Sequence, residues 1–342
     1  MTTRDRPGIA EEQLRACLQE QYDLVPATLE FLPLGLDYDA GVYRLVSEQG
    51  TPYLLKATSR PLYEAAYLVP GYLSDHGITS VVAPLPTIKK TLWSQVGTWR
   101  VIVYPFIDGD TSWVGMTDEQ WRRLGTIFQQ IHQVVLPTSG FESVRRETFD
   151  TTEYSRWIDA FESQHLQQQN QGSDIEKAAR SSWKAHRPTI HAIVTAMEKL
   201  AAALQKQSGP YVICHSDLHA ANLIRDRAGQ VFVIDWDEVM LAPKERDFLF
   251  TGNPPADASS DIPPFFQGYG QIQTDWIALT YYHYERRIQD VIACAENVFK
   301  KDMGERNKAI AAYLLQKNLE GSNERVATAE ATAHLPSDIR HS

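Results

Sequence analysis

The feature that most constrains this chain is one short stretch, residues 214–238, which reads CHSDLHAANLIRDRAGQVFVIDWDE. Two apolar runs, AANLIRD and QVFVID, are typical of short strands, and RAGQ between them has the composition of a turn. Acidic, amide and histidine side chains gather before the first run and after the second. The stretch therefore predicts a β-hairpin with a polar site at its open end.

The spacing of the polar residues indicates what this site could bind. A symmetric turn centred between residues 228 and 229 would place Asn222 opposite Asp235, close enough to share a metal ion. Asp217 precedes Asn222 by five positions, which is enough for a loop to return above the same point. One amide and one carboxylate oxygen, completed by water and phosphate oxygens, suit Mg²⁺.

Two other interpretations of the same residues stay open. Polar side chains often gather at strand ends, so the cluster could be structural, with His215 bonded to the backbone. A zinc site would use His215, Asp217 and His219 as an H-x-D-x-H triplet, although no second His-rich cluster offers the remaining ligands.

The rest of the chain divides into a β-rich first part and a helical remainder. Strand-like pieces fill residues 28–58 and return between 81 and 104, around a helical pattern at 62–76 that contains Pro70 and Gly71. The stretch YPFIDGDTSW at 104–113 is typical of a connection, and Thr117 with Gln120 then forms a capping box. Further helical patterns occupy 152–169, 174–206, 274–299 and 303–319. From about 321 the polar, Ala-rich composition leaves a frayed helix or disorder open.

Composition limits the partners and the compartment. The chain has 33 lysine and arginine residues and 43 acidic residues, which gives a net charge of -10. This charge disfavours nucleic acid as a partner and favours a cationic small molecule. An acidic surface is also common simply because it keeps a protein soluble. Three widely spaced cysteines suit a reducing compartment. No signal peptide or membrane-spanning run is visible, so we expect a cytoplasmic protein that does not interact with a membrane. No coiled-coil seam is visible either, and we expect a monomer.

The motif HSDLHAAN followed by IDWD resembles the catalytic segment of the aminoglycoside phosphotransferases, which belong to the protein-kinase-like superfamily. Within that family the continuation DWDEVMLAPKERD resembles spectinomycin phosphotransferases. The resemblance implies an α+β, bilobal protein-kinase-like fold, with a small antiparallel β-sheet and a helix in the N-lobe and a larger, mainly helical C-lobe. Residues 1–104 would be the nucleotide-binding lobe, 105–113 the hinge and 114–342 the helical lobe with the acceptor site.

The resemblance also implies roles for the residues of the motif. Asp217 would be the catalytic base that orients the acceptor hydroxyl and receives its proton. Asn222 and Asp235 would hold the Mg²⁺ that bridges the nucleotide phosphates. His215 and Asp247 would support the catalytic loop.

The nucleotide is expected to be ATP, and the motif does not exclude GTP. Lys56 in PYLLKAT would face the phosphates, although a lysine that ends a strand is by itself typical of a solvated edge charge. Its expected carboxylate partner is Glu64, with Asp75 as a distant second. The loop from Gly35 to Gly41 would cover the phosphates. The remaining expected nucleotide contacts, at the purine edge, are Tyr104, Phe106 and Ile107.

The acceptor is expected to be a cationic aminocyclitol, with spectinomycin as the leading candidate. Aromatic side chains at helical spacing in WIALTYYHYERRIQD are more typical of a core than of a ligand wall, but four consecutive aromatics cannot all face one core. Carboxylates beside such rings suit a protonated amine. The candidate acceptor residues are Asp237, Glu238, Trp276, Tyr282 and Glu285.

Two alternatives to an antibiotic kinase remain. The first is a small-metabolite kinase of the same fold, acting on choline, methylthioribose, homoserine or fructosamine. The second is a non-catalytic nucleotide-binding module, which the presence of Lys56, Asp217, Asn222 and Asp235 together argues against.

Overall fold

The computed structural model describes residues 8–33, 39–111, 115–167, 171–207, 209–255, 261–300, 303–321 and 324–340. Within these ranges no helix has the length and apolar character needed to cross a membrane. The chain forms two compact units, each assembled from separate segments. Unit 1 comprises residues 1–145, 212–241 and 268–270, and unit 2 comprises 146–211, 242–267 and 271–342. These units divide the chain differently from the expected lobes, because the hairpin at 214–238 belongs with the N-terminal sheet.

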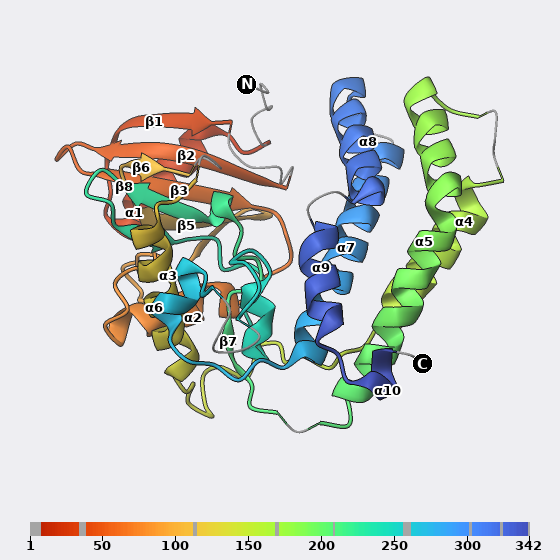
Figure 1. The fold of residues 1–342 in the computed structure, drawn as a ribbon. Helices are drawn as coiled ribbons and strands as arrows, with labels where there is room; N and C mark the ends of the chain where they lie inside the picture. The colour runs from red at the N-terminus through yellow and green to blue at the C-terminus, as the bar shows by residue number, and fades with distance from the viewer. Residues whose placement is uncertain are drawn as a thin grey trace. The chain divides into compact units, whose positions relative to one another are not determined.

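The main sheet of unit 1 is antiparallel, with strand order β1-β2-β3-β5-β4. Figure 1 labels β1, β2, β3 and β5 of this sheet. Alternating side chains bury one face against helix α1, where Leu14, Leu18, Leu45 and Leu55 share a core. The opposite face carries Lys56, which lies across from Ile102 of β5. The bounds are α1 Glu11–Tyr22, β1 Pro26–Leu32, β2 Ala40–Ser47, β3 Pro52–Thr58, β4 Ser94–Val96 and β5 Trp99–Pro105.

Two helices of unit 1 agree with the sequence patterns. Helix α2 (Ala65–Asp75) continues through Pro70. Helix α3 (Asp118–Gln133) begins at the expected capping box, in which the Thr117 and Gln120 side chains each bond the other residue's backbone N–H. Its apolar face buries Leu124 and Phe128. The short helix α6 (Pro264–Tyr269) follows much later in the chain.

The predicted hairpin is present, but its register differs from the expectation by one residue. Strands β8 (Leu223–Asp226) and β9 (Val231–Val233) pair so that Asn222 meets Ile234 and not Asp235, through a bond from the Ile234 N–H to the Asn222 carbonyl. The turn contains three residues, because Asp226 and Gln230 still pair and Gly229 adopts φ +77°. A three-residue turn with a left-handed glycine shifts the register relative to a symmetric two-residue turn.

One short strand and one isolated bridge join this hairpin to other parts of unit 1, and a separate two-stranded sheet flanks the hairpin along the chain. Strand β6 (Gly109–Asp110) pairs with β8, and Val81 forms a parallel bridge with Val233. Strand β7 (Val212–Cys214), which leads into the motif HSDLHAAN, pairs with β10 (Met240–Ala242). The expected hinge therefore contains a strand that pairs with the hairpin.

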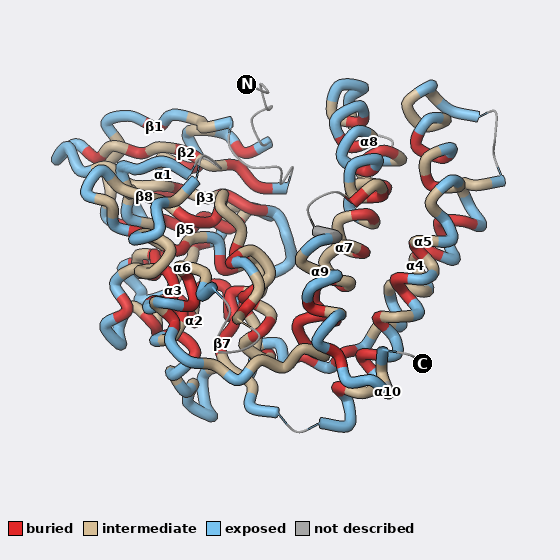
Figure 2. The backbone as a smooth tube through the Cα atoms, in the orientation of Figure 1, coloured by how far each residue is buried: buried red, intermediate tan, exposed pale blue. Residues whose placement is uncertain are grey.

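Unit 2 is a helical bundle in which α5, α7 and α8 pack side by side (Figure 1). Its core includes Trp183, Ile288 and Leu315, and buried segments run along α5 and α7 (Figure 2). The region from 321, where the sequence left helix or disorder open, contains helices, with Ala331 buried in one of them and Leu335 buried in the bend that follows it. The bounds are α4 Thr152–His165, α5 Asp174–Leu204, α7 Trp276–Phe299, α8 Glu305–Glu320, α9 Glu324–Ala333 and α10 Ser337–Arg340.

The two units confirm the predicted fold class, since a small antiparallel sheet is followed by a mostly helical remainder.

Candidate active site

The motif HSDLHAAN begins immediately after β7 with a fully buried histidine. The His215 Nδ1 accepts the Asp217 N–H at 3.3 Å, so its Nε2 carries the proton and donates to the Ile234 carbonyl at 2.9 Å. The His215 ring also packs edge-on against Trp236, with centroids 4.8 Å apart. Both bonds are structural, so His215 joins the catalytic loop to the end of the hairpin.

Asp217 presents a partly exposed carboxylate that its neighbours orient. Its Oδ2 accepts the Asn222 Nδ2–H at 3.3 Å and lies 3.3 Å from the His219 Nε2. Because the His219 Nδ1 accepts the Ala221 N–H, its Nε2 carries the proton and faces the carboxylate. The Asp217 side chain is 26% exposed, which leaves it accessible to a ligand. Ser216 before it adopts φ 72°, a left-handed backbone that costs about 1–3 kcal/mol for such a residue.

Asn222 and Asp235 offer the oxygen chemistry that a magnesium ion requires. The amide nitrogen of the buried Asn222 is used by the Asp217 carbonyl at 2.8 Å, so its amide oxygen is the atom that could bind a metal. Asp235 follows β9 with φ 62°, and its side chain is 46% exposed. The donor set therefore fits Mg²⁺, with one amide oxygen and one carboxylate at the open end of the hairpin.

Lys56 lies in the same unit and pairs with two carboxylates of the segment after β9. Its Nζ is 3.0 Å from Asp235 Oδ1 and 2.8 Å from Asp237 Oδ2. Although burial opposes the charge, the two carboxylates raise the pKa of Lys56. Desolvation opposes the ionisation of both acids. For Asp235, the attraction of Lys56 outweighs desolvation, and the pKa of Asp235 is lowered. For Asp237, burial and the negative charge of the neighbouring Asp235 outweigh the attraction of Lys56, and the pKa of Asp237 is raised.

This pairing corrects the expectation for Glu64. Glu64 precedes α2, is exposed to solvent, and forms no ion pair with any residue in the described ranges. The alternative, Asp75, is exposed at the far end of α2. Spacing along the sequence favoured Glu64 because it is the first acid after Lys56. The packing of the hairpin instead brings Asp237 to Lys56, although the two residues are 181 positions apart.

The expectation that Asp237 and Glu238 contact an acceptor is not supported by their surroundings. Asp237 binds Lys56, and Glu238 Oε2 lies 3.0 Å from the Arg145 guanidinium. Arg145 also donates to the Asp237 carbonyl and stacks on the Tyr63 ring, 4.4 Å from its centroid. Sequence reasoning missed Tyr63 and Arg145, and neither stands in a motif that could have signalled them.

The expected nucleotide-contacting residues are divided between the main sheet and the connection that follows β5. Gly41 is buried in β2, whereas Gly35 lies outside the described residues. Tyr104 stands near the end of β5, and burial raises its pKa. Phe106 and Ile107 follow in the connection to β6, both half-buried, with the Arg44 guanidinium 5.2 Å from the Phe106 ring.

The expected acceptor and support residues of unit 2 are mostly enclosed by protein. Tyr282 is 1% exposed, and its ring lies beneath the Arg246 guanidinium. Glu285 is 6% exposed and forms an ion pair with the same arginine. Both side chains are therefore part of the packed interior of unit 2 and are not presented to a ligand. Trp276 is partly exposed and stacks on His334 at 4.4 Å. Asp247 is buried in a short 3₁₀ helix at Lys244–Phe248, and its support of the loop at 215–222 stays a prediction. The core interpretation of these aromatics is therefore the better one for Tyr282.

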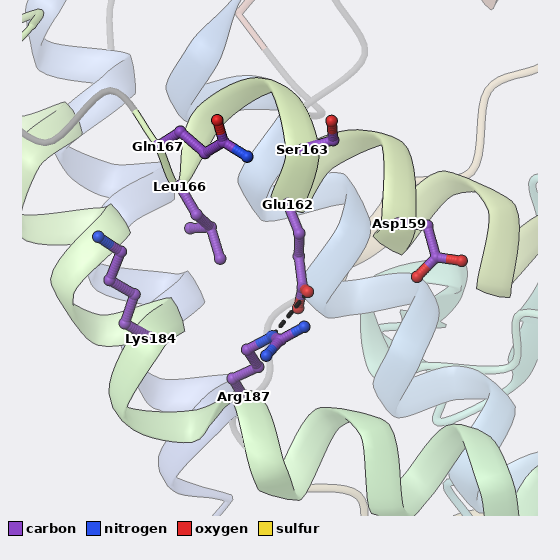
Figure 3. A pocket seen from close by; sticks show the side chains of 7 residues that line it. All are labelled: Asp159, Glu162, Ser163, Leu166, Gln167, Lys184 and Arg187. Atoms are coloured by element: carbon purple, nitrogen blue, oxygen red, sulfur yellow. Dashed lines mark hydrogen bonds and ion pairs between the residues drawn. The ribbon is translucent and has the colours of Figure 1, made fainter.

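A groove in unit 2, between α4 and α5, has a volume of about 500 Å³ (Figure 3). Its buried carboxylate, Glu162, accepts bonds from Trp183, Arg187 and His191 at 3.1, 2.7 and 3.0 Å. These three donors satisfy the buried charge of Glu162, and none of the site residues expected from the sequence lines this groove.

The fold and the site of unit 1 define a kinase-like phosphotransferase. The model of the Phosphotransferase enzyme family, abbreviated APH, matches residues 30–282. A solved structure of spectinomycin phosphotransferase, in complex with ADP and spectinomycin, is 28% identical with a TM-score of 0.81, and covers 95% of this chain and 100% of that one.

More distant solved structures share the fold alone. Amicoumacin kinase in complex with AMP-PNP, Ca²⁺ and Ami is 16% identical, with a TM-score of 0.59 over 92% of this chain and 95% of that one. A choline/ethanolamine kinase family protein from Mesorhizobium loti is 16% identical, with a TM-score of 0.54 over 97% and 99%. Curated protein sequences gave no significant match. The chain belongs to the aminoglycoside phosphotransferase (APH) family, and it is a small-molecule kinase with a hydroxyl acceptor.

Proposed function

We propose that this protein is an ATP-dependent phosphotransferase that modifies a hydroxyl group of a cationic aminocyclitol, with spectinomycin as the acceptor. The observation that carries the proposal is the oriented carboxylate of Asp217 in one compact unit with Asn222, Asp235 and Lys56. The likeness to spectinomycin phosphotransferase over 95% of the chain and the net charge of -10 support the choice of acceptor.

In this mechanism Asp217 accepts the proton of the acceptor hydroxyl while the hydroxyl oxygen attacks the γ-phosphorus of ATP. The bond from the γ-phosphorus to the bridging oxygen breaks, and ADP leaves with the electron pair. Lys56 pairs with phosphate oxygens, and the backbone of Phe106 or Ile107 bonds the purine edge. The oxygens of Asn222 and Asp235 would hold Mg²⁺, which would supply neutralisation of the phosphate charge.

A panel of acceptors tests the proposed function. The purified chain is incubated with ATP or GTP, Mg²⁺ and one acceptor at a time, and ADP or GDP release and phosphorylated product are measured. We expect spectinomycin-dependent turnover with a phosphorylated antibiotic. Turnover only with choline, methylthioribose, homoserine or a fructosamine would show a metabolite kinase. Tight nucleotide binding without turnover on any acceptor would show a binding module.

The metal assignment predicts a changed magnesium requirement in Asp235→Asn. Even the loss of a group that merely supports a metal ligand typically costs 10–100-fold in metal affinity, so we expect the Mg²⁺ concentration for half-maximal activity to rise by roughly tenfold or more. The matched control is Asp226→Asn, at the turn end of the same hairpin. An unchanged Mg²⁺ dependence in a folded Asp235→Asn variant would remove Asp235 from the metal site.

A further inference from the structure

Lys56 needs a fixed carboxylate partner that does not also bind the metal. A lysine side chain has four rotatable bonds, so its ammonium holds one position only where a second charge fixes it. Asp235 is bonded to Lys56, but it is also the residue assigned to Mg²⁺. Asp237, at 2.8 Å, is the other carboxylate on the ammonium.

Helix α2 supplies no such partner within the described residues. Its two nearest acids, Glu64 and Asp75, are both exposed. The face that packs against the sheet beside Lys56 presents Ala66 and Tyr67 to Ile102. The sheet and helix therefore surround Lys56 with apolar and phenolic groups, and its carboxylates come from the segment after β9.

The backbone around Asp237 is held by two residues from other parts of unit 1. The Arg145 Nη2 donates to the Asp237 carbonyl at 3.3 Å, and the Tyr63 hydroxyl donates to the Val239 carbonyl. The Arg145 N–H in turn donates to the Tyr63 oxygen at 3.1 Å, and the Arg145 guanidinium stacks on the Tyr63 ring. Tyr63 and Arg145 thus form one bonded pair that fixes residues 237–239.

Two buried side chains also anchor this segment. Trp236 is 3% exposed and Val239 is fully buried. The preceding residue and the second residue after Asp237 are therefore both anchored in the core, which limits the freedom of the backbone at Asp237. Its carboxylate is therefore directed at Lys56 by packing as well as by the Tyr63–Arg145 pair.

We propose that Asp237 is the carboxylate that holds Lys56 in position for the nucleotide phosphates, and that Tyr63 and Arg145 are positioning residues that aim Asp237. This inference rests on the proposed phosphotransferase function and deepens it. It assigns to Asp237 a part in the nucleotide site and removes it from acceptor recognition. Tyr63 and Arg145 act only through Asp237, without touching nucleotide or acceptor.

A double-mutant cycle tests the link between Asp237 and Lys56. We expect Asp237→Asn to lower kcat/KM for ATP roughly 10- to 100-fold, the range of one charge-assisted bond, and Asp237→Glu to restore part of it. In a Lys56→Met background, adding Asp237→Asn should lower kcat/KM for ATP by less than about threefold, because the ion pair between Lys56 and Asp237 is already lost. Independent, additive losses would overturn the proposal, as would an equal loss in Glu64→Gln.

The positioning pair has its own variants. Tyr63→Phe and Arg145→Met should each lower kcat/KM by roughly tenfold with native thermal stability, and neither should add to Asp237→Asn. The matched control is Arg122→Met, another half-exposed arginine of unit 1, which should match the wild type. Full activity in both folded variants, or losses that add to that of Asp237→Asn, would overturn the role of the pair.

A crystal structure with MgADP separates this inference from the proposed function, because it requires no acceptor turnover. We expect the Lys56 ammonium within hydrogen-bond distance of Asp237. A contact of Lys56 with Glu64, or direct coordination of the metal by Asp237, would overturn the inference while leaving the phosphotransferase assignment intact. Absence of any spectinomycin turnover beside a Lys56–Asp237 contact would instead overturn only the proposed acceptor.

Discussion

Replacing Asp217 with asparagine is expected to lower kcat by about 10² to 10⁴-fold, the usual contribution of a positioned general base, in a protein that still folds. The Asp217 Oδ2 faces the N–H groups of His219 and Asn222. An asparagine would therefore turn its amide oxygen toward these donors and present its NH₂ group at the other position. That group cannot accept the proton of the acceptor hydroxyl.

Three measurements define this result. The kcat at saturating acceptor gives the loss, calorimetric nucleotide binding shows that the site persists, and thermal unfolding shows that the fold persists. Asp226→Asn makes the same chemical change on the same hairpin and should keep wild-type kcat. Turnover within tenfold of wild type in folded Asp217→Asn would exclude Asp217 as the base.

Replacing Arg246 with methionine is expected to destabilise unit 2 by about 3–5 kcal/mol, the usual cost of breaking a buried ion pair. Arg246 Nη1 lies 2.9 Å from both Glu147 Oε2 and Glu285 Oε2, and all three side chains are at most 12% exposed. Methionine preserves most of the volume but leaves two buried carboxylates without their cation. Tyr154 and Tyr281 also donate to Glu285, but these neutral hydroxyl groups do not replace the charge.

The same variant should show a specific pH dependence. Burial already raises the pKa of Glu147 above its usual value, against the effect of Arg246, and loss of the cation raises it further. An acid whose folded-state pKa is raised stabilises the fold most at low pH, and this contribution is lost as the pH rises through that pKa. The stability gap between wild type and Arg246→Met should therefore narrow as the pH falls from 8 towards about 5.

Urea unfolding of the full chain at several pH values measures both effects. The matched control is Arg122→Met, whose partner Glu119 is 63% exposed, and which should change stability by about 1 kcal/mol or less. A urea unfolding midpoint of Arg246→Met close to that of the control would contradict the assignment of a buried charge cluster. A stability difference between wild type and Arg246→Met that increases at acidic pH would contradict it as well.

The short-range parts of the site followed from the sequence. Asp217, Asn222 and His215 lie within eight positions of one another, so a single loop brings them together whatever the rest of the chain does. Capping boxes and strand alternation are equally local, and the box at Thr117 formed as expected. The fold class also followed, because the order of strand-like and helix-like segments survives even where their bounds shift.

Contacts between distant segments did not follow. The hairpin register depended on whether the turn contained two or three residues, and the composition of RAGQ fits both. The partner of Lys56 is 181 positions away, and Arg145 meets Tyr63 across 82 positions. No local pattern encodes such pairs, because they exist only after the hairpin has packed against the sheet.

By itself, the sequence determined the family, the chemistry of the catalytic motif and the kinds of secondary structure, since each depends on residues that are near neighbours along the chain. The tertiary structure alone decided which carboxylates surround Lys56 and which aromatics of α7 are enclosed. Burial and long-range pairing are properties of the packed chain as a whole, where the cost of leaving a charge without a partner selects among acids that look equivalent in sequence.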